Sequence, residues 1–552
     1  MVTRRKKSPK INFMVSKDRY SRRLYALFSR AGLRACGKTP LLALLVLLTA
    51  CAVPYAPPPP PPMAKADLQD LTEVFAVGYR NISEKYIVPI SAEVIALDGL
   101  SGLSSIDPAL QVHKRGKSVV LSYSGNMVTS RKAPTADNSV AWALVTTDIT
   151  IAAKSVSADM LNASNEKVFE AVFDGVLSGL DIFSRYAGAE EAKRNRARRD
   201  GFGGIGVTFK IKHAQIIVTA VLPGTPAEDA GLRTGDVITA INGKPAQGLS
   251  RSTVVSRLRG PTQTDITITV RSPQAQQTNT VVLTRQHIVP VTVTEKRYRG
   301  LLYFKIASFN QDTARSLSAK LTKAQAEMGS GLKAIALDLR GNPGGLLKQS
   351  VKVADLLLSH GKIVSTRGRH LDSLHDYDAS GDDVANGIPV AVFIDGKSAS
   401  AAEIVAAALQ DRNRAVVIGT SSYGKGTVQT VIRLPNDGEI TLTWSRFMAP
   451  SGYPLHGLGV RPSVCTSTQD RSAEQIIKET FLASAELKTT FESWRLPSLQ
   501  AEDIRSKLRA TCPPEKHQAQ AEMAVAKRLL GDSIVYDKAL DLSAKHSQAR
   551  KE

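Results

Sequence analysis

Cysteines, acidic side chains and long apolar runs are all scarce in this sequence. Only four cysteines occur among its 552 residues, and 50 acidic residues stand against 72 basic ones, which gives a net charge of +22. The apolar run at residues 41–48 is too short to be a membrane-spanning helix. We find no internal repeat, and a chain of this length is expected to fold into three or four domains at about 150 residues each.

The positive charge is concentrated at the start of the chain. The first 39 residues carry twelve basic side chains and a single acid, and the apolar run that follows ends in Leu48-Thr49-Ala50-Cys51. A basic segment, a short apolar run and small residues before a cysteine are typical of an export signal. The last four residues resemble the lipobox of bacterial lipoproteins, in which the cysteine is acylated. An apolar helix buried in the protein is the alternative interpretation.

On the lipoprotein interpretation, residues 1–50 are a signal peptide and Cys51 is the lipid-carrying first residue of the mature chain. Residues 51–65 then form a linker in which six consecutive prolines make a stiff spacer. The protein is expected in the bacterial cell envelope, lipid-anchored and facing the periplasm. Ala52 after the cysteine resembles outer-membrane sorting in enteric bacteria, which implies the outer rather than the inner membrane. Removal of the signal peptide takes half of the net charge with it, so nucleic-acid binding is not expected.

Two cysteines, Cys465 and Cys512, remain once Cys36 is cleaved off and Cys51 is lipidated. In an oxidising compartment they are expected to form a disulfide that ties a C-terminal segment to the domain before it. Two separate buried thiols are the alternative, and the sequence does not decide between them.

The region after the linker, residues 66–200, is predicted to be mainly helical. Apolar residues recur there at helical spacing, with β-like alternation around Val119–Tyr123 and Val140–Val145. Residues 190–200 form a charged run, which indicates a solvated helix face or a linker.

Three further regions follow. Residues 201–287 contain short strands punctuated by glycine, with a hairpin signal at Asn242-Gly243. Residues 288–466 alternate strands with helices, which is typical of an α/β domain, and residues 467–552 are helical and polar. The fold class is therefore multidomain, with α/β and α+β parts between a helical N-terminal region and a helical C-terminal extension.

Three loops of the α/β region follow predicted strands and carry polar or glycine residues, a common location of catalytic groups. The first contains Gly344 and Gly345, and glycines let backbone N–H groups turn toward an anion. The second places Ser400 at the start of a helix, where Glu403 three residues later also makes a simple capping box. The third holds Lys425 between two glycines, as exposed turns often do. Each loop taken alone has an explanation without catalysis.

Reaction chemistry connects Ser400 with Lys425. A serine hydroxyl needs a base to take its proton, and a lysine can do so only when it is neutral. Because the ordinary pKa of lysine is about 10.4, burial has to lower the pKa to about 7 for such a role. Gln429, on the same side of a predicted strand as Lys425, can orient the amine without adding a charge. His456 is a rival candidate for the base.

The three loops resemble the signature blocks of the carboxyl-terminal processing peptidases, also called tail-specific proteases. The order of segments is similar over about residues 165–465. The resemblance implies that Ser400 is the nucleophile, that Lys425 is the general base and that Gln429 orients the lysine.

The same resemblance implies an oxyanion hole and a fold for the catalytic core. The N–H of Ala401 and the N–H of Gly344 or Gly345 would stabilise the oxyanion. The core would be an α/β fold of the crotonase/ClpP-like type. Ala402 stands where a serine is frequent in the family, which does not touch the expected chemistry.

The glycine-punctuated region resembles a PDZ domain of the bacterial protease type. The resemblance implies a loop whose N–H groups bind the terminal carboxylate of a peptide, and a strand that pairs with the peptide. Two apolar helix residues would line a pocket, or would belong to the core. The peptide-binding residues implied are Gly204, Ile205, Gly206, Val207, Phe209, Val254 and Leu258.

Together these features predict a serine endopeptidase that recognises C-terminal tails of periplasmic or envelope proteins through its PDZ domain and cleaves them by acyl transfer. No cofactor and no metal ion is implied. Expected partners are protein or peptide substrates with apolar tails and, through the lipid, a membrane; an adaptor lipoprotein and a homo-oligomer are compatible with the family resemblance. The alternative is a catalytically silent lipoprotein scaffold, for which replacing Ser400 with alanine would leave every activity intact.

Overall fold

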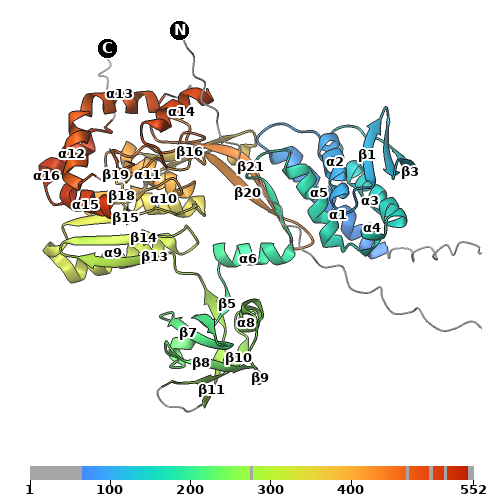
Figure 1. Cartoon of the computed structure of the whole chain (residues 1–552), viewed down its shortest axis with the longest axis horizontal. Helices are drawn as coiled ribbons and strands as arrows, with labels where there is room; N and C mark the ends of the chain where they lie inside the picture. Colours follow the sequence, from blue (N-terminus) through green and yellow to red (C-terminus); the bar gives the residue numbers. More distant parts are fainter. Residues whose placement is uncertain (1–64, 274–277, 468–470, 497–500, 515–518, 545–552) are drawn as a thin grey trace, which may run out of the picture. The chain divides into compact units, whose positions relative to one another are not determined.

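The computed structural model describes residues 65–273, 278–467, 471–496, 501–514 and 519–544 (Figure 1). The predicted signal peptide, Cys51 and nearly all of the proline-rich linker lie outside these residues. Within the described ranges, no helix combines the length and the apolar character needed to cross a membrane.

Residues 65–187 enclose one apolar cluster, in which Phe75, Tyr79, Trp142 and Phe173 are buried. Three of its strands pair antiparallel in the order β1-β2-β3. The elements are α1 (Lys65–Lys85), α2 (Ala92–Ser101), η1 (Gly102–Ser105), β1 (Leu110–Arg115), β2 (Ser118–Tyr123), β3 (Asn126–Lys132), α3 (Ser139–Val156), α4 (Ala158–Asn162), α5 (Asn165–Leu177) and β4 (Arg185–Ala187).

The expected β-like segment Val140–Val145 is wrong, because it lies inside α3. Asn138 caps this helix through its Oδ1, which accepts the N–H of Ala141 at 3.0 Å. Trp142 and Val145 are buried three residues apart, which places them on one helix face. A short apolar alternation does not distinguish a helix from a strand. The other predicted strand, Val119–Tyr123, lies in β2.

Residues 202–288 form a domain of strands with two short helices, and its main sheet has the order β11-β10-β8-β7-β6 with β9 on β8. β12 pairs with β5, so the end of the domain returns to its start. Asn242 and Gly243 turn between β8 and β9 with φ of 50° and 71°. The elements are β5 (Phe202–Gly204), β6 (Val207–Lys212), β7 (Gln215–Val221), α7 (Pro226–Asp229), β8 (Val237–Ile241), β9 (Lys244–Pro245), α8 (Arg251–Leu258), β10 (Asp265–Arg271), β11 (Thr278–Thr284) and β12 (Gln286–Ile288).

The α/β region is built on a sheet of order β13-β14-β15-β18-β19-β22, in which β14 to β22 run parallel and β13 is antiparallel. Parallel strands need crossover connections, which the helices here supply. The elements are β13 (Val293–Tyr298), β14 (Leu301–Ile306), α9 (Thr313–Met328), η2 (Gly329–Gly331), β15 (Ala334–Asp338), α10 (Leu347–Asp355), β18 (Val390–Ile394), α11 (Ala401–Asp411), β19 (Ala415–Gly419) and β22 (Val464–Cys465).

Both faces of this sheet are buried, as expected for parallel strands. Ile335 and Val392 belong to the cluster with α9, α10 and α11, whereas their neighbours Ala336 and Phe393 belong to the cluster with the C-terminal helices. Because side chains alternate between the faces of a strand, the all-apolar strands of the sequence contribute to both clusters.

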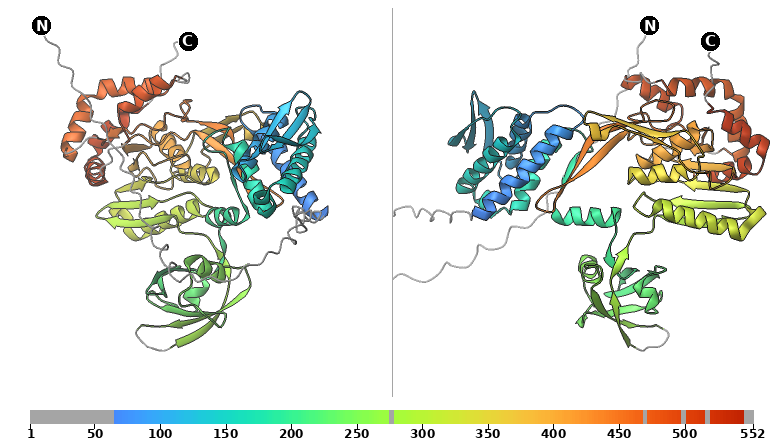
Figure 2. Two further views of the ribbon diagram at one scale, coloured as in Figure 1. Left: turned by 45° about the vertical axis from the view of Figure 1, so that its right-hand side comes forward. Right: turned by 180° about the vertical axis from the view of Figure 1, so that it is seen from behind.

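A second sheet of order β17-β16-β21-β20 carries β4 on β21. Its strands are β16 (Lys362–Gly368), β17 (His375–Asp378), β20 (Thr427–Arg433) and β21 (Glu439–Met448), with η3 (Leu371–Ser373) between the first two. One end of the β20–β21 ribbon packs on α1 and α5 through Ile432, Ile440 and Leu442 (Figure 2). The helix α6 (Ala189–Arg199) follows β4.

The C-terminal extension consists of α12 (Ala473–Leu482), α13 (Ser484–Trp494), α14 (Glu502–Ala510), α15 (Ala519–Leu530) and α16 (Ser533–Asp541). A disulfide joins Cys465 at the end of the α/β sheet to Cys512 after α14, with 5.9 Å between the Cα atoms. The extension is therefore fastened to the edge strand of that sheet.

Candidate active site

One cavity of about 430 Å³ brings together most of the residues predicted to catalyse. Ser400, Ala401, Gly345, Lys425 and Gln429 all line it. The loops that lead to Gly345, Ser400 and Lys425 follow β15, β18 and β19, three neighbouring parallel strands whose C-terminal ends meet at one edge of the sheet. Gln429 lies in β20.

Ser400 occupies the sharp junction between the loop after β18 and helix α11. Its backbone has φ 58° and ψ −115°, a conformation that an L-residue adopts only with strain. A Cβ atom on Gly344 would lie 2.9 Å from the Cβ of Ser400, so the glycine loop can approach the serine only without a side chain. The junction thus presents Ser400 to the cavity at the start of a helix, where unpaired N–H groups gather.

Two backbone N–H groups beside Ser400 have no partner within the part of the chain that the structure describes: those of Ala401 and Gly345. The N–H of Gly344, in contrast, donates to Asn342 Oδ1 at 2.8 Å. Of the two glycines that the sequence left open as oxyanion donors, Gly345 has the available N–H and lines the cavity.

Lys425 lies in a tight loop that precedes β20. A Cβ atom on Gly426 would meet the N of His456 at 2.0 Å, which explains the second glycine of the Gly-Lys-Gly sequence. Burial, and secondly the positive charge of Arg185, lower the pKa of Lys425, while Asp181 and Glu403 oppose this. The amine is therefore closer to neutrality than an exposed lysine.

The amine of Lys425 rests on an aromatic ring in this structure. Its Nζ lies 4.8 Å from the centroid of the Phe183 ring. Within the described residues no hydrogen bond joins it to Ser400 or to Gln429. The amide of Gln429 instead donates to Thr427 Oγ1 at 2.9 Å and Thr443 Oγ1 at 3.2 Å. The predicted dyad thus shares one cavity, and the expected contact from Gln429 to the lysine is not formed.

The sequence treated Glu403 as a helix cap, but its carboxylate connects the loop of Ser400 with the loop of Lys425. Oε2 accepts the N–H of Ser400 at 2.7 Å and that of Lys425 at 2.9 Å. Oε1 accepts the hydroxyl of Ser422 at 2.5 Å and the N–H of Gly424 at 2.7 Å. The side chain is fully buried, and its burial raises the pKa of Glu403 while the four donors lower it. A carboxylate that only accepts is the form that suits four donors.

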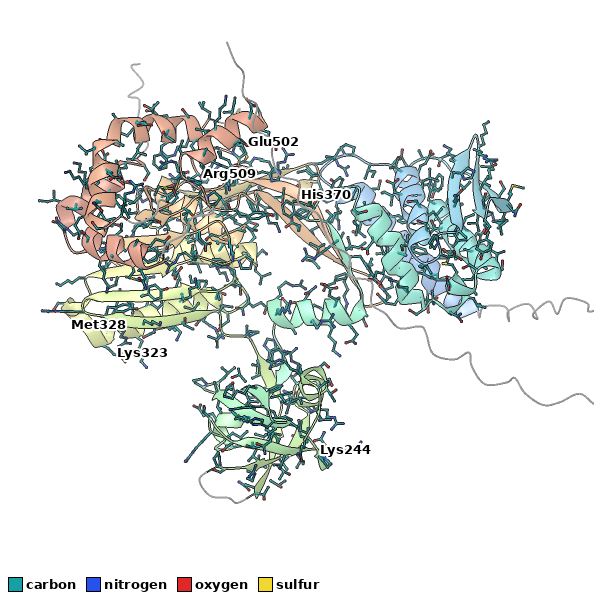
Figure 3. The ribbon with its side chains drawn as sticks, in the orientation of Figure 1. Lys244, Lys323, Met328, His370, Glu502 and Arg509 are labelled. Carbon is teal, nitrogen blue, oxygen red and sulfur yellow. A yellow bond between two sulfur atoms is a disulfide. The ribbon has the colours of Figure 1, made fainter. Side chains whose placement is uncertain are left out.

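The C-terminal extension contacts the loop of Lys425 and the segments next to it. Arg509 of α14, labelled in Figure 3, donates to the carbonyl of Leu458 at 2.5 Å. Its Nη1 would lie 3.4 Å from a Cβ atom added to Gly424. Close by, the carbonyl of Cys512 accepts the N–H of Ser421 at 3.3 Å. The disulfide therefore anchors a segment that touches the loop of the candidate base.

His456, the rival base, does not line the cavity. Its ring packs edge-on against Phe183 at 6.4 Å, and burial lowers the pKa of His456. Among the described residues, no group of three or more histidine, cysteine or acidic side chains is placed to hold a metal ion.

A second cavity, of about 380 Å³, lies in the domain of residues 202–288 and is lined by Ile205, Gly206, Val207, Phe209 and Leu258 among others. β6, which borders it, is an edge strand of its sheet and is open to pairing with a peptide. The N–H groups of Ile205 and Gly206 donate to no group in the described ranges.

One of the seven predicted peptide-binding residues takes another position. Val254 is fully buried in the domain core and does not line the groove, whereas its neighbour Val255 does. Successive helix residues point about 100° apart, so a small error in helical phase exchanges a core position for a groove position. Leu258 lines the groove as predicted, and Gly204 does so from the end of β5.

Comparisons with known proteins agree with this geometry. Residues 300–465 match peptidase family S41, and residues 217–272 match the PDZ domain. The chain is 39% identical over 303 residues to the carboxy-terminal-processing protease of Bartonella bacilliformis, covering 54% of this chain and 70% of that protein. It is 33% identical over 323 residues to a probable CtpA-like serine protease of Staphylococcus aureus, covering 57% of this chain and 64%, less than two thirds, of that protein.

Among solved structures, the photosystem II D1 C-terminal processing protease is 26% identical, with 56% of this chain and 87% of that one covered and a TM-score of 0.32. The sequence matches define a serine-type peptidase with a PDZ domain. The chain belongs to peptidase family S41, among the carboxy-terminal-processing proteases.

Proposed function

We propose that this peptidase captures the apolar C-terminal tail of an envelope protein in its PDZ groove and cleaves the protein by acyl transfer at Ser400. One observation carries the proposal: Ser400, Lys425 and the unpartnered N–H groups of Ala401 and Gly345 share a single cavity. A nucleophile, a base and two oxyanion donors are the set that acyl transfer requires.

The first half-reaction forms an ester on the enzyme. Lys425 Nζ takes the proton of the Ser400 hydroxyl as Oγ bonds to the scissile carbonyl carbon, and the N–H groups of Ala401 and Gly345 stabilise the negative oxygen. When the intermediate collapses, the C–N bond breaks and the Lys425 ammonium returns the proton to the leaving amine. Nζ must leave the Phe183 ring for this step, because proton transfer needs hydrogen-bond reach.

The second half-reaction releases the product. Lys425 takes a proton from water, the resulting hydroxide attacks the ester carbonyl carbon, and the C–O bond to Ser400 breaks as the oxygen regains a proton from Lys425. The same two N–H groups stabilise the second oxyanion. Lys425 therefore begins and ends the cycle neutral, which its burial favours.

A degradation assay tests the proposal with an unfolded protein that has an apolar C-terminal tail. We expect Ser400→Ala and Lys425→Ala to abolish cleavage, and Lys397→Ala to retain it, since Lys397 is an exposed lysine that does not line the cavity. Equal turnover by all four proteins would contradict catalysis by Ser400 and Lys425 and favour the catalytically silent scaffold.

The PDZ groove has its own test. Leu258→Asp places a charge in the apolar groove, so we expect a higher KM for the tailed protein and an unchanged rate for a short peptide without the tail. An equal effect on both substrates would show that the groove does not select tails.

The envelope location rests on the sequence of the leader segment and the lipobox-like residues. Cys51→Ser should move the protein from the membrane fraction to the soluble fraction of a bacterial host. Radiolabelled palmitate that is incorporated by the wild type and by Cys51→Ser alike would contradict lipidation at this cysteine.

A further inference from the structure

The cavity of Ser400 and Lys425 carries an excess of positive charge. Arg185, Arg198 and Arg199 line it together with Lys425, whereas Glu439 is the one acid among its described lining residues. Excess positive charge in a cavity attracts ligands that carry negative charge, so it affects which peptides bind there.

Glu439 is already neutralised by neighbouring arginines. Its side chain is 4% exposed and forms ion pairs with Arg196 at 3.0 Å and with Arg199 at 3.2 Å. Arg185 and Arg198 are exposed, and within the described ranges the guanidinium group of neither has an ion pair or a hydrogen bond. Two guanidinium groups therefore face the cavity with their donors unused.

The two arginines approach the cavity from different elements. Arg185 on β4 stands opposite Thr441 of β21, which stands opposite Val431 of β20, and all three line the cavity. Residues directly opposite each other in antiparallel strands share one face of the sheet. Arg198 comes from α6, where it shares a side of the helix with Asn195.

An extended peptide has an edge to pair with beside these arginines. β20 is the last strand of its sheet, with no further strand on its outer side in the described residues. Its residues Thr427 to Gln429 line the cavity next to Ser400. A peptide added along this edge would pass both the nucleophile and the cationic face.

We propose that Arg185 and Arg198 bind a carboxylate of the substrate peptide while the scissile bond lies at Ser400, so that the peptidase prefers an acidic group near the cleavage site. This specificity rests on the proposed function. A guanidinium offers two parallel N–H groups that match the two oxygens of a carboxylate. An aspartate or glutamate side chain and the free α-carboxylate of a chain end both supply that group.

Three peptides of one neutral sequence distinguish these two sources. One carries a single glutamate and an amidated end, the second has glutamine in its place, and the third has glutamine and a free carboxylate end. Moving the glutamate along the sequence locates its position. We expect kcat/KM for one carboxylate peptide to exceed that of the glutamine amide by about 5- to 10-fold, as one charge-assisted pair in a partly solvated cleft produces.

Variants of the full chain assign the preference to the arginines. The double variant Arg185→Gln/Arg198→Gln should reduce the kcat/KM ratio of the carboxylate peptide to the glutamine amide to about 1. Each single variant should lose part of this preference, so the single variants provide the test if the double variant fails to fold. Arg194→Gln is the matched control, since Arg194 is an exposed arginine of α6 that does not line the cavity. It should keep the wild-type ratio.

A wild-type ratio of 1 for every carboxylate peptide, or a ratio that survives in the double variant, overturns the inference. Fluorescence anisotropy of the same peptides on Ser400→Ala separates it from the proposed function. One outcome is that wild type cleaves no peptide, Ser400→Ala binds the glutamate peptide more tightly than the glutamine peptide, and the double arginine variant loses this difference. In that case the proposed reaction is wrong and the proposed carboxylate site is supported. Cleavage without any carboxylate preference would mean that the reaction is right and the carboxylate site is wrong.

Discussion

Replacing Glu403 with glutamine distinguishes a helix cap from a residue that holds the loops of Ser400 and Lys425 together. The wild-type carboxylate accepts hydrogen bonds from Ser400, Ser422, Gly424 and Lys425. A glutamine has one acceptor oxygen, so its NH₂ group must face two of these donors. The less costly orientation turns it toward Ser422, whose hydroxyl can rotate, and leaves the N–H of Gly424 unpaired. One buried unpaired N–H and the lost charge together cost about 2–4 kcal/mol of unfolding free energy.

A cap alone predicts a much smaller effect, and the chain contains its own comparison. In α12 the capping-box partner of Ser472 is Gln475, whose Oε1 accepts the N–H of Ser472 at 2.8 Å. Glutamine therefore serves this purpose in the same protein. If Glu403 were only the equivalent partner of Ser400, Glu403→Gln would change the unfolding free energy by less than about 0.5 kcal/mol.

Urea unfolding measures the free-energy difference, and kcat/KM for a neutral peptide measures the alignment of the site. We expect activity of Glu403→Gln to fall by about 100-fold, because a loop shift of about 1 Å at the base has an effect of that size. Gln475→Glu in α12 is the control and should change neither quantity. Stability and activity both equal to those of the wild type in Glu403→Gln would refute the four-contact account.

Three further perturbations have definite signs. Arg185→Gln should move the rise of kcat/KM with pH to higher pH for an uncharged peptide, because burial first and the Arg185 charge second lower the pKa of Lys425; a move to lower pH would contradict this. Ser400→Gly should be about 1 kcal/mol more stable to urea than Ser400→Ala, since glycine tolerates φ 58° and ψ −115°; equal stability would mean that the junction is unstrained. Reducing Cys465–Cys512, which closes a loop of 47 residues, should lower the unfolding free energy by about 4 kcal/mol, and identical urea midpoints with and without reductant would argue against the bond.

The loops that carry Ser400 and Lys425 were predictable because their signals are local. A buried strand followed by glycine or small polar residues is visible in sequence, and parallel strands bring such loops to one edge. Ser400 and Lys425 lie 25 residues apart in the chain and line one cavity. The sequence could not tell which way the lysine amine turns, because that depends on Phe183 from a distant segment.

Hydrogen bonds that the residue pattern does not reveal decide the points that the sequence left open. Gly344 and Gly345 are equivalent in the pattern, and only the bond from Gly344 to Asn342 makes Gly345 the available donor. Glu403 satisfies the local rule for a cap, so nothing nearby in sequence reveals its bonds to Gly424 and Lys425.

The charged run at residues 190–200 shows the same limit. Composition predicts a solvated helix or linker, and α6 is indeed a helix. Glu439, with which α6 forms ion pairs, is more than two hundred residues away along the chain. The position of Arg198 at the cavity of Ser400 depends on how α6 packs there. Charge runs of this kind have a structural meaning only once their partners are known.

Trapping the acyl-enzyme tests the central claim most directly. Wild type, Ser400→Ala and Lys425→Ala are mixed with an activated ester of a short peptide, quenched in acid and digested, and the fragments are measured by mass spectrometry. We expect an acyl group on Ser400 in the wild type, and none at this position in either variant. An acyl group on another residue of the wild type, or undiminished labelling of Ser400 in Lys425→Ala, would contradict it.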